Sequence, residues 1–176
     1  MKKLMMVAAL CFGLFAQAEE HKLTTITGSH DIQLKEYDHS IAGSVKDFVI
    51  FGNVSETSNS AELTMKKDGQ MIRTVFQKEG NELGGTIHHE VEGRAIDTRI
   101  VFKGLDKDNN KINFEVNGKP AVVTVLADAM ENNHYINPQY VVTYEGQLIM
   151  YKLNNGQACY RYSTFMAFLM LGAVLH

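Results

Sequence analysis

Cys159 is the residue whose type and position most clearly suggest covalent chemistry. It lies between the turn Asn155-Gly156 and an apolar segment that begins at Thr164, so it precedes an expected helix by a few residues. The positive end of a helix dipole favours a thiolate, and the thiolate is the nucleophilic form of cysteine. Such a nucleophile also needs a base, and His134 or His88 is the upstream histidine that would supply it.

The sequence around this cysteine carries a short resemblance to a known family. Gly156-Gln157-Ala158-Cys159-Tyr160, followed by an apolar helix, resembles in outline the nucleophile region of papain-like cysteine hydrolases. The resemblance implies a hydrolase that uses Cys159 with a histidine base. Its residue order departs from the family, where the base follows the cysteine, because only His176 follows Cys159. The implied enzyme is therefore circularly permuted and uses His134, and the alternative is a thiol packed under the helix as a small apolar side chain.

The start of the expected mature chain carries a possible metal site. Cleavage of a signal peptide after Ala18 would leave Glu19-Glu20-His21 at the N-terminus, with an imidazole third after a free amine. The amine, two deprotonated amides and the imidazole form the square-planar set that Cu²⁺ and Ni²⁺ favour. Glu19, Glu20 and His21 are thus candidate copper or nickel ligands, and the alternative is a polar terminus without metal.

His88-His89-Glu90 is a weaker candidate for metal binding. In a strand over residues 86–91, His88 and Glu90 share one face and His89 lies on the other. A tetrahedral site needs three or four ligands, and Asp97 is a candidate for a further one. Solvent-facing histidines on a half-exposed strand are the more common situation.

Four aromatic residues near the C-terminus are candidates for binding an apolar ligand. Tyr160, Tyr162, Phe165 and Phe168 lie beside or within the apolar segment, where they would line a cavity inside a β-barrel. The alternative is that these rings belong to an ordinary hydrophobic core.

A C-terminal helix must position these side chains. Residues 164–175 are apolar almost throughout, and their large side chains cover every side of a helix. A helix of this kind must be buried, in protein or in membrane. Its apolar run would be about 16 Å long, roughly half of a bilayer core, so we expect it to pack in protein and not to span a membrane. A strand is the alternative, although the Met, Leu and Ala content favours a helix.

Between residues 22 and 153, short alternating or β-branched runs predict strands joined by turns. The clearest is 111–116, where Ile112, Phe114 and Val116 share one face. Similar runs occupy 23–27, 47–54, 61–66, 71–78, 86–91, 96–103, 121–126, 140–144 and 148–153. Roughly eight to eleven strands at this spacing predict an antiparallel barrel or sandwich, between which spacing does not decide. The stretch 128–139 is expected to be a long loop.

The first eighteen residues have the features of a cleavable export signal. Lys2 and Lys3 are followed by an apolar stretch over 4–15 and by Ala16-Gln17-Ala18, the small-x-small pattern of a signal peptidase site. The short Lys-Lys start followed by Met, Ala and Leu is typical of bacterial signal peptides. We therefore expect the mature protein in the periplasm or the medium. Three segments result: a signal over 1–18, an antiparallel β domain over 19–153, and a cysteine-containing turn with the helix over 154–176.

Charge and composition exclude some classes of function. The chain of 176 residues has a formal net charge of −3, and its lysines and arginines are dispersed. Nucleic-acid binding is disfavoured because it needs clustered basic residues.

Cys11 lies in the signal, so Cys159 is the remaining thiol and an intramolecular disulfide is not expected. We expect no cofactor, and nothing in the sequence gives the oligomeric state.

The sequence thus predicts a mainly β protein, a single antiparallel β-barrel or β-sandwich with one apolar C-terminal helix packed on it. The leading functional hypothesis is an exported, non-enzymatic protein of the cell envelope that binds a small apolar or amphipathic ligand or acts structurally, because no complete catalytic set is visible. The alternatives are the permuted cysteine hydrolase with Cys159 and His134, and the copper or nickel binder with Glu19, Glu20 and His21.

Overall fold

The computed structural model describes residues 23–55, 60–79 and 82–175. The expected signal segment and the candidate metal ligands Glu19, Glu20 and His21 lie outside the described residues.

Twelve antiparallel strands form a closed barrel. In chain order the barrel strands are β1 (Thr24–Gly28), β2 (Ile32–Tyr37), β3 (Ser40–Val45), β4 (Phe48–Ser55), β5 (Ser60–Lys67), β6 (Gln70–Glu79), β7 (Glu82–Val91), β8 (Arg94–Asp106), β9 (Lys111–Val116), β10 (Lys119–Leu126), β13 (Gln139–Tyr144) and β14 (Gln147–Asn154). Neighbours in the barrel are mostly neighbours in sequence, and β1 closes it by pairing with β14. The barrel prediction is confirmed, and the sandwich alternative is wrong.

Alternating side chains and tight turns explain why the sequence forms this sheet. In β9, Ile112, Phe114 and Val116 are buried inside the barrel, as the period-two pattern predicts. The turn that follows, Asn117-Gly118, has φ angles of 47° and 81°. These positive values suit asparagine and glycine, and they give the two-residue hairpin turn whose twist matches the strands.

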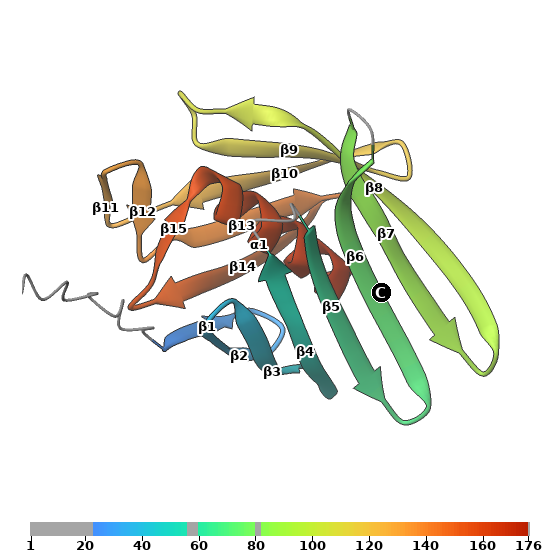
Figure 1. Cartoon of the computed structure of the whole chain (residues 1–176). Coiled ribbons are helices and arrows are strands. Elements are labelled where there is room, and N and C mark those ends of the chain that lie inside the picture. The colour runs from blue at the N-terminus through green and yellow to red at the C-terminus, as the bar shows by residue number, and fades with distance from the viewer. Residues whose placement is uncertain (1–22, 56–59, 80–81, 176) are drawn as a thin grey trace, which may run out of the picture.

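The helix α1 (Tyr160–Val174) occupies the interior of the barrel. Figure 1 shows it running between the strands, and it contacts β5 and β6 on one side and β13 on another. Every side chain from Tyr162 to Ala173 is buried. The helix therefore supplies the centre of the core that the inward-facing strand residues surround. Among the described residues, no helix has the length and hydropathy needed to cross a membrane.

A second, three-stranded sheet lies at one end of the barrel (Figure 1). It consists of β11 (Ala129–Glu131), β12 (His134–Ile136) and β15 (Gln157–Cys159), with β12 in the middle. The long loop predicted over 128–139 is therefore wrong, because most of that stretch forms the β11–β12 hairpin. The strand β15 leads directly into α1, so this small sheet, the end sheet, positions the start of the helix.

The predicted number of strands was too low. The sequence prediction missed β2 and β3 because IQLKEY alternates only over its first residues and SIAGSV contains a glycine and few large apolar side chains. It missed β11, β12 and β15 because three-residue strands are too short to show a period. These strands are specified by their pairing partners, which are distant in sequence.

Candidate functional site

The aromatic residues predicted to line a cavity lie in two different places. Phe165 and Phe168 are inside the barrel, where both rings pack on Phe76 with centroid distances of 5.2 and 4.3 Å. Tyr162 is also buried, and its ring lies 6.4 Å from that of His39. The structure thus fills this part of the barrel interior with protein side chains.

Tyr160 lies apart from the other three, at the end sheet. Its ring packs edge-on against Tyr135 at 5.2 Å, and the Lys107 ammonium lies 5.1 Å from the ring centroid. Its hydroxyl donates to the Met130 sulfur at 3.8 Å. Tyr135 in turn donates to Asn110 Oδ1 at 2.9 Å, and burial is the main reason that its pKa is raised above the ordinary value for a phenol. These contacts attach the end sheet to the β8–β9 turn.

The structure places Cys159 and His134 next to each other. Cys159 ends β15 and His134 begins β12, and the two residues are direct antiparallel partners. Side chains at such positions lie on the same face of a sheet, with Cβ atoms about 4.5–5.5 Å apart. The residue that the hydrolase hypothesis chose as the base therefore neighbours the proposed nucleophile, whereas the alternative His88 lies on β7 in the barrel wall.

Both side chains of this pair also make local contacts. Cys159 is the N-cap of α1, and its sulfur accepts a hydrogen bond from the Tyr162 backbone N–H at 3.4 Å. His134 Nδ1 lies 3.0 Å from the backbone oxygen of Asn132. Because a carbonyl oxygen can only accept, Nδ1 carries a proton in this contact, and in the neutral ring Nε2 is then the acceptor nitrogen. This is the tautomer that a general base would need.

A second feature is an amphipathic groove on the outside of the barrel, over β1 to β5. We define the outer groove by Lys35, Ala42, Val49, Phe51 and Lys66. Two adjacent hollows make it up, one of about 740 Å³ over β1–β3 and one of about 450 Å³ beside β4–β6. The two hollows are neighbours on the sheet, because Ala42, which lines the first, pairs with Phe51, which lines the second. On its other side Ala42 pairs with Lys35.

The groove combines exposed apolar side chains with lysines. Val49 and Phe51 are 62% and 46% exposed, which is high for residues of their size. The Lys66 ammonium lies 5.5 Å from the centroid of the Phe51 ring, in cation–π contact. The neighbouring Lys67 is bound to Asp47 at 2.7 Å, and this hydrogen bond lowers the pKa of the Asp47 carboxyl. Lys35 and Lys66 thus lie at the two sides of an apolar floor, and Asp31 and Asp68 also line the two hollows.

No protein-family profile, curated protein or solved structure matches this chain.

The histidine pair on β7 does not form a metal site with its neighbours. His88 and Glu90 do share the outer face, and Asp97 lies across from His88, with His88 Nδ1 2.6 Å from Asp97 Oδ1. Within the described part of the chain, no group of three or more His, Cys, Asp or Glu side chains could hold a metal ion. The cross-strand contact instead joins an imidazole and a carboxylate on β7 and β8.

The outer groove was missed by sequence reasoning, although a signal was present. Phe48-Val49-Ile50-Phe51 is a run of four apolar residues in a strand whose other side faces solvent. Phe48 and Ile50 are buried, so Val49 and Phe51 must project outward. Consecutive apolar residues in a half-exposed strand thus indicated an apolar outer face.

Proposed function

We propose that the protein is an exported, non-enzymatic protein of the cell envelope that binds a small amphipathic ligand in the outer groove. The observation that carries the proposal is the exposed apolar floor of Val49 and Phe51 between Lys35 and Lys66. Each of the two hollows has a volume in the range of sites for small molecules.

The chemistry of the groove indicates what kind of ligand would bind. An apolar chain on Phe51 and Val49 would remove exposed apolar surface from water, which is the main favourable term in such binding. An anionic headgroup would pair with Lys66 or Lys35 at the sides of that floor. A single-chain anionic amphiphile therefore satisfies both parts of the groove.

Titration calorimetry with dodecanoate tests this proposal. We expect the mature protein to bind dodecanoate, and Phe51→Ser to weaken binding by at least about tenfold, because a buried aromatic contact contributes about 1.5–3 kcal/mol. Leu148→Ser is the matched control, since Leu148 is 56% exposed on β14 outside the groove. Equal weakening by both variants would show non-specific apolar binding. Absence of binding in the wild type would leave a structural role in the envelope.

Export is tested separately. We expect protein recovered from the periplasm or medium of its own host to begin at Glu19 by N-terminal sequencing. Retention of Met1 in a cytoplasmic fraction would contradict export. A mature N-terminus at Glu19 would also make the copper and nickel hypothesis testable, by titrating Cu²⁺ into the protein before and after acetylation of its amine.

The pairing of Cys159 with His134 favours a second candidate function, thiol-dependent hydrolysis. In that reaction the Cys159 thiol would transfer its proton to His134 Nε2 and attack the carbonyl carbon of an ester or amide. The leaving group would depart with that proton, and water would then hydrolyse the acyl-cysteine thioester and restore the thiol. We expect iodoacetamide to alkylate Cys159 faster in the wild type than in His134→Gln. His30→Gln is the control, because His30 is an exposed histidine next to β1. Equal alkylation rates in all three proteins would assign Cys159 to capping the helix and nothing more.

A further inference from the structure

A polar hollow on the outer face of β6–β8 has no part in the function proposed above. It has a volume of about 220 Å³, the share of roughly seven water molecules in the liquid. Its floor lies at Gly84, which has no side chain to fill the space between Gln77 on β6 and Val101 on β8. An added Cβ at Gly84 would lie 2.7 Å from the Ile100 carbonyl oxygen. Glycine at this position therefore allows β7 and β8 to approach closely, and its missing side chain also leaves the floor of the hollow open.

The walls of this hollow carry hydrogen-bonding groups of both kinds. Thr86 and Arg99 face each other across β7 and β8, and Asp97 lies two residues from Arg99 on the same face. Asn117 is fixed at the rim, because the Arg99 backbone N–H donates to its Oδ1 and its own N–H donates to the Arg99 carbonyl, each at 2.9 Å. With Oδ1 used in this way, the Asn117 side-chain NH₂ is the group left to donate to a ligand.

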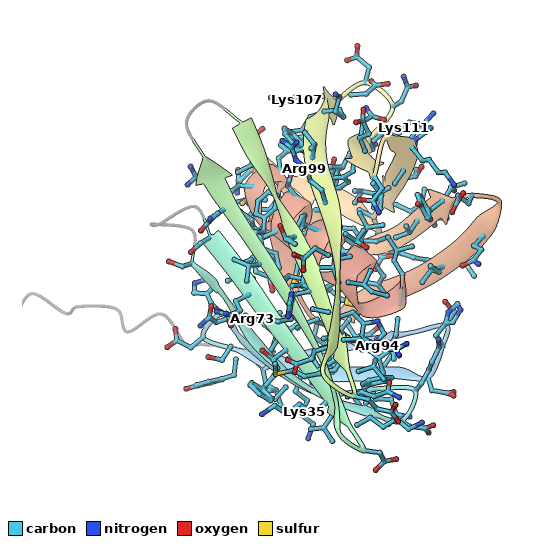
Figure 2. The ribbon with its side chains drawn as sticks, turned by 90° about the vertical axis from the view of Figure 1, so that its right-hand side faces the viewer. Lys35, Arg73, Arg94, Arg99, Lys107 and Lys111 are labelled. Atoms are coloured by element: carbon cyan, nitrogen blue, oxygen red, sulfur yellow. The ribbon has the colours of Figure 1, made fainter. Side chains whose placement is uncertain are left out.

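The described residues that line the hollow include one cation and one anion, Arg99 and Asp97. Their backbone positions are two residues apart on β8, about 6.6 Å along the strand. The contact of 2.6 Å with His88 Nδ1 orients the Asp97 carboxylate. Figure 2 shows Arg99 part-way along β8, well separated from Arg94 near the β7–β8 turn. A simple anion would meet Asp97 as well as Arg99, so the hollow is poorly suited to an anion alone.

From this arrangement we infer that the hollow binds one unit of a neutral saccharide. Each hydroxyl group of a sugar both donates and accepts, so a sugar ring matches alternating acceptors and donors around a space of this size. Asp97 accepts, Arg99 and Asn117 donate, and Gln77 and Thr86 do both. The ligand class differs from the amphiphile proposed for the outer groove, and the two sites share no lining residue.

Saturation-transfer NMR with glucose, galactose and N-acetylglucosamine tests the inference on the full mature protein. We expect at least one of these sugars to bind, and Arg99→Gln and Asp97→Ala each to weaken it by at least about tenfold, as expected for loss of hydrogen bonds to charged groups. Arg94→Gln is the matched control and should bind as the wild type does. All three changes are at exposed positions, so the barrel core is untouched.

Two results would overturn the inference. One is the absence of sugar binding by the wild type at concentrations up to about 50 mM, or binding that Arg99→Gln leaves unchanged. The other is tighter binding of acetate or sulfate than of any sugar, which would assign the hollow to anions. Dodecanoate affinity should be the same in Arg99→Gln and wild type, so failure here is distinguishable from failure of the outer groove.

Discussion

Two stacked tyrosines inside the barrel differ in how their hydroxyl groups are satisfied. Tyr140 and Tyr151 are cross-strand partners with ring centroids 4.8 Å apart. The Tyr140 hydroxyl donates to Ser163 Oγ on α1 at 3.0 Å, whereas the buried Tyr151 hydroxyl has no hydrogen-bond partner among the described residues. The first hydroxyl joins the helix to the wall, and the second has lost water without compensation.

Removing each hydroxyl should therefore have a different effect on stability. We expect Tyr140→Phe to lower the free energy of unfolding by about 1 kcal/mol, because Ser163 loses its partner. Tyr151→Phe should leave the free energy unchanged or raise it, since it removes an unsatisfied buried group. Urea unfolding of both variants measures the difference. A larger loss for Tyr151→Phe than for Tyr140→Phe would show that its hydroxyl binds an internal water.

Burial of these two phenols also predicts how stability depends on pH. Burial raises the pKa of both Tyr140 and Tyr151 above the ordinary value of 10.0. Above pH 10 the unfolded chain releases these protons and the folded protein keeps them, so stability is complete below pH 10 and falls as pH rises further. We expect urea midpoints to decline from about pH 10 upward, and less steeply in the Tyr140→Phe, Tyr151→Phe double variant. Equal slopes would contradict this account.

At the scale of elements, close contacts between α1 and the barrel wall depend on missing side chains. An added Cβ at Gly172 would lie 2.1 Å from Thr74 Oγ1 on β6, and one at Gly85 would lie 2.8 Å from Phe168 Cζ. Glycine at these two positions lets the helix and wall approach each other. The Thr74 hydroxyl is itself buried, and it has no hydrogen-bond partner in the part of the chain that the structure describes, so it contributes mainly volume.

A double-mutant cycle tests this contact. We expect Gly172→Ala to lower the free energy of unfolding by about 1–3 kcal/mol, because overpacking forces the helix from its place. The loss should be smaller in a Thr74→Ala background, with a coupling of about 0.5–3 kcal/mol. Thr74→Ala alone should change stability little. Additive effects would show that the helix accommodates the extra methyl group without contacting Thr74.

For the whole molecule, the barrel and its helix form one core. The side chains from Phe165 to Leu171 are at most 2% exposed, and inward-facing rings of β6 and β9 pack on Phe168. A closed sheet of this size without its helix would enclose an unfilled apolar interior, which proteins rarely tolerate.

Loss of the helix should therefore unfold the barrel. We expect Phe168→Ala to lower the free energy of unfolding by about 3–5 kcal/mol, which is a large part of the roughly 5–15 kcal/mol that stabilises a typical domain. Deletion of residues 160–176 removes many such contacts, and we expect loss of near-ultraviolet circular dichroism together with dye binding typical of exposed apolar surface. A truncated chain that unfolds cooperatively would show that the barrel is stable alone.

The sequence alone determined the class of the fold and much of its local structure. Alternation in runs such as 111–116 and pairs such as Asn117-Gly118 are local signals, and the strands and hairpins they predict are present. The helix was predicted from 164–175, and its true start at Tyr160 depends on the Cys159 cap, which is also local. These features were predictable because the interactions that specify them join residues close in sequence.

Tertiary structure alone decided where the functional candidates lie. Cys159 and His134 became neighbours because β12 pairs with β15, and the outer groove exists because Phe51, Ala42 and Lys35 fall in register across β4, β3 and β2. Closure of the barrel by β1 and β14 joins residues that are far apart in the chain. Register and closure follow from the summed pairing of whole strands around the helix, and a one-residue slip would move every side chain to the opposite face.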